Sequence, residues 1–336
     1  MTRRSLRLPL QFRLLTTCFV LLTSLVSLSG AQTPALDSKQ ADGDFAIQGE
    51  YVGTLPQDGS PLKIGVQVIA LGSGKFRAVG YHGGLPGDGW DGGEKHETEG
   101  ELKDGAVTFK TDSASAEIRD GLMTIRNADG DKLGECKRLI RQSSTIGAKP
   151  PAGAIVLFDG STADNFVGGK LDGDLLVQGV TSKQKFQDFT LHLEFLLSYM
   201  PAARGQGRAN SGCYAQGRYE VQILDSFGLS GEHNECGGIY TVKKPDVNMC
   251  FPPLSWQTYD IDFKAAKFDD AGKKTADARM TVKHNGVVIH NDVAVGKATT
   301  AAPVPEGKDP GPIYVQDHGN PVRFRNIWIV DHQAKK

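Results

Sequence analysis

Short runs of alternating apolar and polar residues, separated by glycine-rich turns, make up most of the chain. A two-residue period with turn residues at both ends is typical of β-strands, and it recurs from Phe45 to Arg141 and again beyond Ala154. None of these runs has the 3.6-residue period of an amphipathic helix. Asn285-Gly286, placed between two alternating runs, gives the strongest hairpin signal. The pattern predicts an all-β protein.

The turn signals divide the chain into two domains. Residues 45–141 contain enough short β-strand runs to form a small β-barrel or β-sandwich. Residues 154–331 hold about ten runs, which predicts two packed antiparallel sheets. Between these domains, residues 142–153 are polar and contain a pair of prolines, which is the composition of a linker. Residues 32–44 are small and polar, so we expect a disordered N-terminus there, and residues 332–336 form a short tail.

The N-terminal segment, residues 1–31, has the layout of a secretory signal peptide. Four arginines accompany an apolar run from Leu14 to Leu28, and small residues follow at the positions that a signal peptidase reads. A membrane anchor needs about 20 apolar residues, whereas this run is shorter and is interrupted by Thr and Ser. We therefore expect cleavage near Ala31, a periplasmic or extracellular location, and no membrane span in the mature chain.

The charge balance bears on the partners of the mature chain. Cleavage removes four of the 38 basic residues and none of the 39 acidic ones, which leaves a net charge near −5. Such a mildly acidic surface gives no electrostatic reason to bind nucleic acid or an anionic membrane. The oligomeric state is left open by the sequence.

The mature chain keeps four cysteines, Cys136, Cys213, Cys236 and Cys250. An oxidising compartment permits disulfides, and Cys236 with Cys250, 14 residues apart, is the candidate pair, although spacing alone does not fix the connectivity. A zinc site is less favoured because no C-x-x-C spacing occurs.

Strand alternation sorts the polar residues of the second domain by face. Where the apolar residues of a strand point into the core, the polar residues between them point outward. Asp225 comes where its strand ends, so its direction stays open. An outward face carrying the polar residues of several strands would be a floor for a sugar-sized ligand, while each residue taken singly is more simply solvated surface. The rule also places His192 and Tyr314 outward, and the residues of the expected polar floor are Glu194, Glu220, Gln222, Gln316 and His318.

Several longer motifs occur in the second domain in a fixed order. They are Leu157-Phe158-Asp159-Gly160, Asn210-Ser211-Gly212, Gly217-Arg218-Tyr219-Glu220-Val221-Gln222-Ile223-Leu224-Asp225, Gly238-Ile239-Tyr240, Gln316-Asp317-His318-Gly319 and Phe324-Arg325-Asn326-Ile327. In order and spacing they resemble the 3-keto-disaccharide hydrolase family. The resemblance covers about residues 155–330 and does not extend to the first domain.

What the resemblance implies is a concanavalin-like (jelly-roll) antiparallel β-sandwich that acts on glycosides already oxidised to a ketone at C3. Such an enzyme removes the C2 proton, eliminates the C1 substituent and hydrates the product, so that the net reaction is hydrolysis. A C3 ketone acidifies the neighbouring C2 hydrogen, and the reaction needs a base, a group that stabilises the enediolate, and an acid for the leaving group.

The resemblance also implies roles for individual residues. The base could be Glu220, Glu194 or Asp225, and His318 could act as a base, an acid or a metal ligand. A cation for the enediolate could come from Arg218 or Arg325. Sugar hydroxyls suit Asn210, Gln222 and Gln316, and Tyr240 joins them as a substrate-binding residue. No cofactor is certain; a divalent metal would suit these ligand types, but no local motif such as H-E-x-x-H supports one and the metal is unknown.

Two other functions remain open. A β-sandwich of this class can bind carbohydrate without any chemistry, because a fold alone does not settle function. A binding surface would rely on aromatics and amides, whereas this chain offers ionisable groups, which favours the enzyme. The first domain could instead be an interaction domain of a surface assembly, and nothing in residues 45–141 argues against that reading.

Overall fold

The computed structural model describes residues 33–57 and 60–333, and these residues form an all-β protein, as the sequence predicted. The predicted signal peptide and most of the predicted tail lie outside the described residues. Within the described part, helical structure is confined to three short 3-10 turns, η1 (Ser38–Gln40), η2 (Gly43–Ala46) and η3 (Gly205–Gly207). No helix among these residues is long and apolar enough to cross a bilayer.

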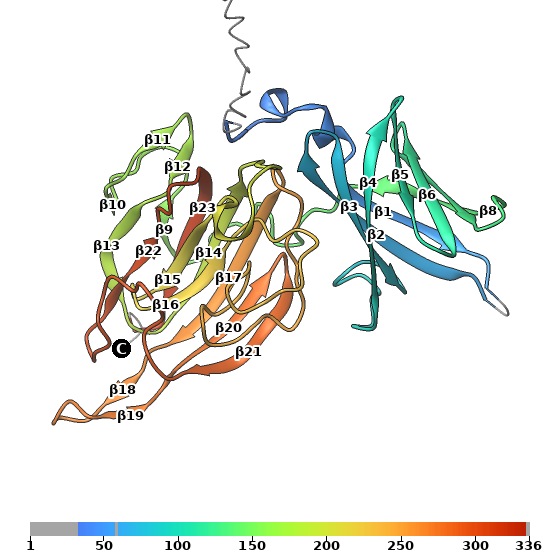
Figure 1. The fold of residues 1–336 in the computed structure, drawn as a ribbon. Helices are drawn as coiled ribbons and strands as arrows, with labels where there is room; N and C mark the ends of the chain where they lie inside the picture. The colour runs from blue at the N-terminus through green and yellow to red at the C-terminus, as the bar shows by residue number, and fades with distance from the viewer. Residues whose placement is uncertain (1–32, 58–59, 334–336) are drawn as a thin grey trace, which may run out of the picture. The chain divides into compact units, whose positions relative to one another are not determined.

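The first part of the chain closes into an eight-stranded antiparallel barrel (Figure 1). Each strand pairs with the next one in sequence, and β1 also pairs with β8, so no strand is left with a free edge. The strands are β1 (Gly49–Leu55), β2 (Leu62–Gly72), β3 (Lys75–His82), β4 (Lys95–Lys103), β5 (Ala106–Lys110), β6 (Ala114–Arg119), β7 (Leu122–Asn127) and β8 (Lys132–Leu139).

The second part contains two larger sheets and a small two-stranded one. The five-stranded sheet has the order β10-β13-β22-β15-β16, the eight-stranded sheet has the order β11-β12-β23-β14-β17-β20-β21 with β9 paired to β23, and β18 pairs with β19. Their strands are β9 (Ile155–Phe158), β10 (Phe166–Val167), β11 (Leu171–Asp172), β12 (Leu175–Val177), β13 (Val180–Phe186), β14 (Phe189–Leu197), β15 (Ser211–Ala215), β16 (Tyr219–Ile223), β17 (Trp256–Lys264), β18 (Lys267–Phe268), β19 (Lys274–Ala276), β20 (Ala278–His284), β21 (Val287–Val295), β22 (Gly311–Val315) and β23 (Val322–Asp331).

The two large sheets form a β-sandwich around one apolar core. Val221 and Ile223 of the five-stranded sheet belong to the same buried cluster as Leu191, Leu193 and Ile261 of the eight-stranded sheet. These apolar residues occupy alternate positions on their strands, which is why the residues between them face away from the core.

The β20–β21 hairpin turns at Asn285-Gly286, as the sequence predicted. Both residues have positive φ, 53° for Asn285 and 84° for Gly286. A two-residue turn of this kind needs positive φ at both positions, and its twist matches the twist of the flanking strands.

Residues 33–44, which belong to the segment 32–44 that was predicted to be disordered, are ordered in the structure. Ala35 forms an antiparallel bridge with Tyr199, and the hydroxyl of Tyr199 donates to Asp42 at 2.9 Å. The side chains of Asp37 and Asp42 cap the two 3-10 turns. Tertiary contacts with a buried tyrosine therefore order a segment whose low hydrophobicity would leave it unfolded in isolation.

The predicted linker, residues 142–153, packs on the outer face of the eight-stranded sheet. The hydroxyl of Thr145 donates to Asp260 of β17 at 2.8 Å, and the backbone N–H of Gly147 donates to Glu194 of β14 at 2.6 Å. The carbonyl of Ala148 accepts a hydrogen bond from Trp328 of β23 at 3.1 Å. Contacts to three strands hold this segment in place, so it does not behave as the free linker that its composition indicated.

Candidate active site

A polar pocket of about 130 Å³ lies on the outer face of the five-stranded sheet. Six of the residues that the sequence singled out line it: Asn210, Glu220, Gln222, Tyr240, Gln316 and His318. The other lining residues are Gln206, Tyr214, Thr300 and Ala301, which the sequence analysis did not name. Tyr214 could have been found by the same alternation rule, because it lies between the core residues Cys213 and Ala215.

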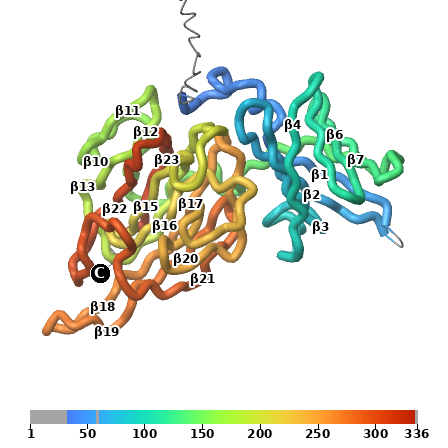
Figure 2. The backbone as a smooth tube through the Cα atoms, viewed as in Figure 1, coloured from blue at the N-terminus to red at the C-terminus, as the bar shows by residue number. Residues whose placement is uncertain are grey.

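Three neighbouring strands position the pocket residues. β15 lies between β16 and β22 in the sheet (Figures 1 and 2), with Tyr214 opposite Glu220 on one side and opposite Tyr314 on the other. The backbone N–H of Gln316 donates to the carbonyl of Gly212 at 2.9 Å, which extends the pairing beyond the end of β22. Side chains from three chain segments therefore meet on one face.

Glu220 is a buried carboxyl, with only 2% of the residue exposed. Burial raises the pKa of Glu220 to about 8, while a hydrogen bond with the Tyr214 hydroxyl acts in the opposite direction. Near neutral pH such a group exchanges protons easily, because its protonated and ionised forms are both populated. A carboxyl with these properties in a polar pocket is a candidate general base or acid.

Gly212 makes room for the Glu220 carboxyl. A β-carbon at position 212 would lie 2.1 Å from Oε1 of Glu220, so the side chain of Glu220 passes over the glycine. Gly212 is opposite Gln222 in the sheet, two pairs away from Tyr214 and Glu220 and on the same face. The glycine lets the carboxyl rest against the sheet.

An amide network surrounds Glu220. Nε2 of Gln222 donates to Oε1 of Gln206 at 3.0 Å, and Nδ2 of Asn210 donates to the carbonyl of Gln206 at 2.8 Å. With its amide turned, Gln222 instead donates to Oε1 of Glu220 at 3.0 Å and to the carbonyl of Ser211 at 2.8 Å. Amides that can donate and accept are suited to sugar hydroxyls, which do the same.

Tyr214 provides a hydroxyl inside the pocket. Its oxygen accepts a hydrogen bond from Nε2 of Gln316 at 3.2 Å. Burial, together with the neighbouring Glu220, raises the pKa of Tyr214 far above its ordinary value. Tyr214 therefore stays protonated and can donate a hydrogen bond at any physiological pH.

Glu194 does not share this face with Glu220. It belongs to β14 in the eight-stranded sheet, where the 142–153 segment covers it, so the outward face expected from alternation is divided between the two sides of the sandwich. Its side chain is 1% exposed and accepts hydrogen bonds from Arg325 at 2.7 Å and Asn326 at 2.9 Å. Burial opposes ionisation, but the hydrogen bonds from His192, Asn326, Arg325 and Gly147 outweigh it and lower the pKa of Glu194 to about 2.

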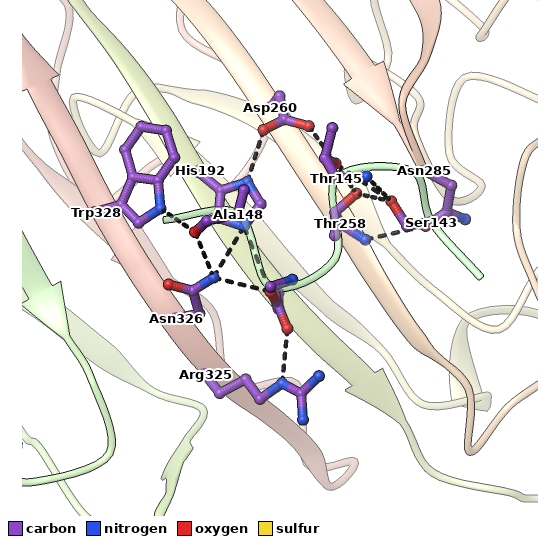
Figure 3. Close-up of polar contacts among 12 residues, drawn as sticks. Ser143, Thr145, Ala148, His192, Thr258, Asp260, Asn285, Arg325, Asn326 and Trp328 are labelled. Atoms are coloured by element: carbon purple, nitrogen blue, oxygen red, sulfur yellow. Dashed lines mark hydrogen bonds and ion pairs between the residues drawn. The ribbon is translucent and has the colours of Figure 1, made fainter. Parts of the chain in front are cut away.

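His192 lies beside Glu194 in the same buried cluster. Its Nδ1 is 2.6 Å from Oδ1 of Asp260, and its ring stacks on Trp328 with 5.1 Å between the centroids (Figure 3). Burial opposes the charged form, but hydrogen bonds to Asp260 and Glu194 outweigh this and raise the pKa of His192. We call a set of six residues the latch: Glu194, Asp260, Asn326 and Trp328, which hydrogen-bond to the 142–153 segment, and His192 and Arg325, which hydrogen-bond to these side chains.

Asp225 and Arg218 also lie outside the pocket. Asp225 is fully buried and pairs with Arg208 at 2.6 Å. Arg218 donates to the carbonyls of Pro305 and Asp309 at 2.8 and 2.9 Å, so it fixes the loop that precedes β22. Asp225, a predicted base, and Arg218, a predicted cation, are thus bound to other parts of the chain and do not face the pocket. No Arg or Lys is among the residues that line the pocket.

The remaining predicted features concern cysteines and metal. The four described cysteines are buried free thiols, so the predicted Cys236–Cys250 disulfide is not formed in the structure. Sγ of Cys236 is 3.2 Å from the hydroxyl of Tyr259, and a hydrogen bond joins the two thiols. Among the described residues, no group of three or more His, Cys, Asp or Glu side chains is arranged to hold a metal ion.

Comparison with known proteins concerns the second part of the chain. Two crystal structures of candidate glycosyl hydrolases from Parabacteroides distasonis ATCC 8503 are similar to it. One, at 2.13 Å resolution, is 32% identical with a TM-score of 0.48, over 54% of this chain and 84% of the other. The second, at 1.70 Å, is 18% identical with a TM-score of 0.40, over 53% of this chain and 94% of the other.

Comparison with curated protein sequences finds no match. Residues 153–330 match the profile of the 3-keto-alpha-glucoside-1,2-lyase-like domain. The match spans more than half of the chain and contains every residue that lines the polar pocket. The chain therefore belongs to the 3-keto-alpha-glucoside-1,2-lyase-like family.

Proposed function

We propose that the chain is an exported enzyme that cleaves 3-keto-glycosides by elimination and hydration, with Glu220 as the base. The observation that carries this proposal is a buried carboxyl with a pKa of about 8 inside a polar pocket. A carboxylate of ordinary pKa is a weak base for a carbon-bound proton, and burial strengthens it. The family membership supports a substrate of this class.

The reaction begins when the Glu220 carboxylate takes the proton from C2, which the C3 ketone acidifies. The electron pair of the C–H bond forms an enediolate across C2 and C3. The ketone then re-forms, a double bond forms between C1 and C2, and the bond from C1 to the aglycone oxygen breaks. The aglycone takes a proton and leaves as an alcohol. Water adds to C1 and a proton returns to C2, which completes a net hydrolysis.

The other pocket residues have roles that follow from their hydrogen-bonding groups. Tyr214, which stays protonated, and the amide of Gln316 can donate to the enediolate oxygen as its negative charge develops. His318 is exposed and lies at the rim of the pocket, where a departing aglycone can reach it, so it is suited to protonate the leaving group. Asn210, Gln222 and Tyr240 are placed to bind sugar hydroxyls.

The size of the pocket limits what it can enclose. Its volume of about 130 Å³ is close to that of a cavity of about 150 Å³ that holds one benzene ring. A hexose is larger than benzene, so the pocket encloses only part of one sugar ring, and the aglycone stays outside, which is consistent with an acid at the rim. Export through the N-terminal signal and a concanavalin-like jelly-roll order for the sandwich are also parts of this proposal.

The test is to incubate the purified protein with a 3-keto-glucoside, and separately with the same glucoside not oxidised at C3. We expect release of 3-keto-glucose from the first only, and in D₂O we expect deuterium at C2 of the product. No release from the 3-keto-glucoside, with or without added divalent metal ions, would falsify the enzyme proposal. Saturable binding of the sugar without turnover would instead support a non-catalytic carbohydrate-binding protein.

A further inference from the structure

The lumen of the eight-stranded barrel contains a second pocket, also of about 130 Å³. Val66, Phe109, Met123 and Ile125 form its walls, and they come from β2, β5 and β7. Phe109 and Met123 are almost completely buried and belong to the apolar core of the barrel. The pocket is therefore an apolar space inside the barrel and lies outside the segment that matches the family.

Small residues leave this space open. Ala78, Gly80 and Ala116 line the pocket at positions where larger side chains would fill the lumen. Other lumen positions carry Tyr51, Phe76 and Val107, each fully buried. The interior of an eight-stranded barrel is just wide enough to be filled by side chains or to hold one small ligand. The small residues in this part of the barrel therefore favour a lumen that holds one small ligand.

The pocket also has polar groups, and only some of them have protein partners. The Thr98 hydroxyl donates to the carbonyl of Lys110 at 3.0 Å, and the Thr111 hydroxyl accepts from the N–H of Ala114 at 3.1 Å. In contrast, no hydrogen bond to another described residue is made by the ring of His96, which packs against His82 at 5.1 Å between centroids. His96 is exposed, so this free polar group lies toward the mouth of the pocket.

We propose that the barrel lumen binds a small aromatic alcohol of the phenol class. The ring would lie among Val66, Phe109 and Met123, and the hydroxyl would lie at the mouth beside His96. The volume sets the size of the ligand, because a cavity of about 150 Å³ holds one benzene ring and this pocket measures about 130 Å³. A mostly apolar wall with a few polar groups that fix the orientation is typical of small-molecule sites. The proposal does not depend on the reaction proposed for the polar pocket.

The test is a titration of the full chain with phenol, followed by NMR of methyl-labelled Val, Ile and Met residues. We expect saturable shifts of the Val66, Met123 and Ile125 methyl signals, while the methyls of the exposed Val288 on β21 stay unchanged. Benzene should cause the same shifts with weaker affinity. Either the absence of saturable shifts at the lumen methyls or equal shifts at Val288 would overturn the proposal.

A substitution that fills the lumen provides the matched variant. Ala116→Leu places a larger side chain in the pocket and should weaken phenol binding at least about tenfold, whereas Ala128→Leu, in the exposed turn between β7 and β8, should leave it unchanged. Thermal unfolding shows whether each variant is folded. If Ala116→Leu does not fold, Ala78→Val fills the same space with less strain. Unchanged affinity in a folded lumen variant would contradict binding in the barrel.

The orientation of the ligand is tested at the mouth of the pocket. In the variant His96→Ala, the affinity for phenol should fall to that for benzene, because the group that binds the ligand hydroxyl is removed. If the preference for phenol over benzene is unchanged, the hydroxyl does not lie at this mouth and the phenol class is the wrong one.

Discussion

The carboxyl of Glu220 rests over the α-carbon of Gly212, on the strand next to its own. A β-carbon at position 212 would come within 2.1 Å of Oε1 of Glu220, well inside van der Waals contact. The clash involves the end of a flexible side chain and not the backbone, so the carboxyl can move aside while the sheet is kept. The position of the proposed base therefore depends on the absence of a side chain at Gly212.

Gly212→Ala should reduce activity without unfolding the protein. The displaced carboxyl would no longer meet the C2 proton in the right geometry, and misplacement of a catalytic group by about 1 Å can cost about a hundredfold in rate. We expect kcat on a 3-keto-glucoside to fall by at least about tenfold, with KM and the melting temperature little changed. Wild-type kcat in a folded Gly212→Ala variant would show that the close approach of these residues has no catalytic role.

Glu220→Gln should abolish turnover and stabilise the fold at neutral pH. The folded-state pKa of Glu220 is about 8, above the ordinary value of 4.5, so its neutral form is favoured by folding. Stability from this group is fully present below pH 4.5 and is lost as the pH rises through 8. At pH 7 the amide should remove a cost on the order of 3 kcal/mol.

Chemical denaturation of both proteins at several pH values measures this difference. We expect the stability gain of Glu220→Gln to grow as the pH increases from 5 toward 8. Glu117→Gln, at an exposed position of the barrel, is the matched control and should change neither activity nor stability. Full activity of Glu220→Gln would remove Glu220 from the mechanism.

The pH dependence of kcat/KM should follow the ionisation of Glu220. Only the ionised carboxylate can accept the C2 proton, so the rate should rise with pH and level off above about 8. A steady-state profile on a 3-keto-glucoside between about pH 5 and 9 covers the transition. A plateau that begins near pH 5 would mean that the base has an ordinary carboxyl pKa and is not Glu220.

Much of the polar pocket could be predicted because strand alternation is a local rule. Val221 and Ile223 are apolar, so Glu220 and Gln222 had to face outward, and the same rule would have found Tyr214. The rule does not say which outer face of a sandwich a strand belongs to. The sheet order places Glu194 on the opposite side from Glu220, and that order follows from pairing between strands distant in sequence.

The roles of the other charged residues could not be predicted for a related reason. Asp225 pairs with Arg208, 17 residues away, and Arg218 binds carbonyls of a loop about 90 residues further along. No local sequence pattern predicts partners that are so distant along the chain. The 142–153 segment has the composition of a linker because its polar groups would be solvated in isolation, but the polar outer face of β14, β17 and β23 offers them hydrogen bonds.

The latch should control how firmly the 142–153 segment is held. Glu194→Gln removes a buried charge that accepts hydrogen bonds from Arg325, Asn326 and Gly147, and it should destabilise the protein by on the order of 3 kcal/mol. Limited proteolysis should then cut within residues 142–153 faster than in the wild type. Glu232→Gln, at an exposed loop position, serves as the control and should show neither effect.

The pH dependence of the latch follows from its two titrating groups. The pKa of Glu194 is about 2, below the ordinary 4.5, so its stabilisation is present above pH 4.5 and is lost as the pH falls toward 2. The pKa of His192 is raised above 6.5, so its stabilisation is present below pH 6.5 and is lost as the pH rises through its folded value. Proteolysis within residues 142–153 should therefore be slowest between about pH 4.5 and 6.5. A cutting rate that is independent of pH after correction for the protease, or one that Glu194→Gln leaves unchanged, would show that the latch does not hold this segment.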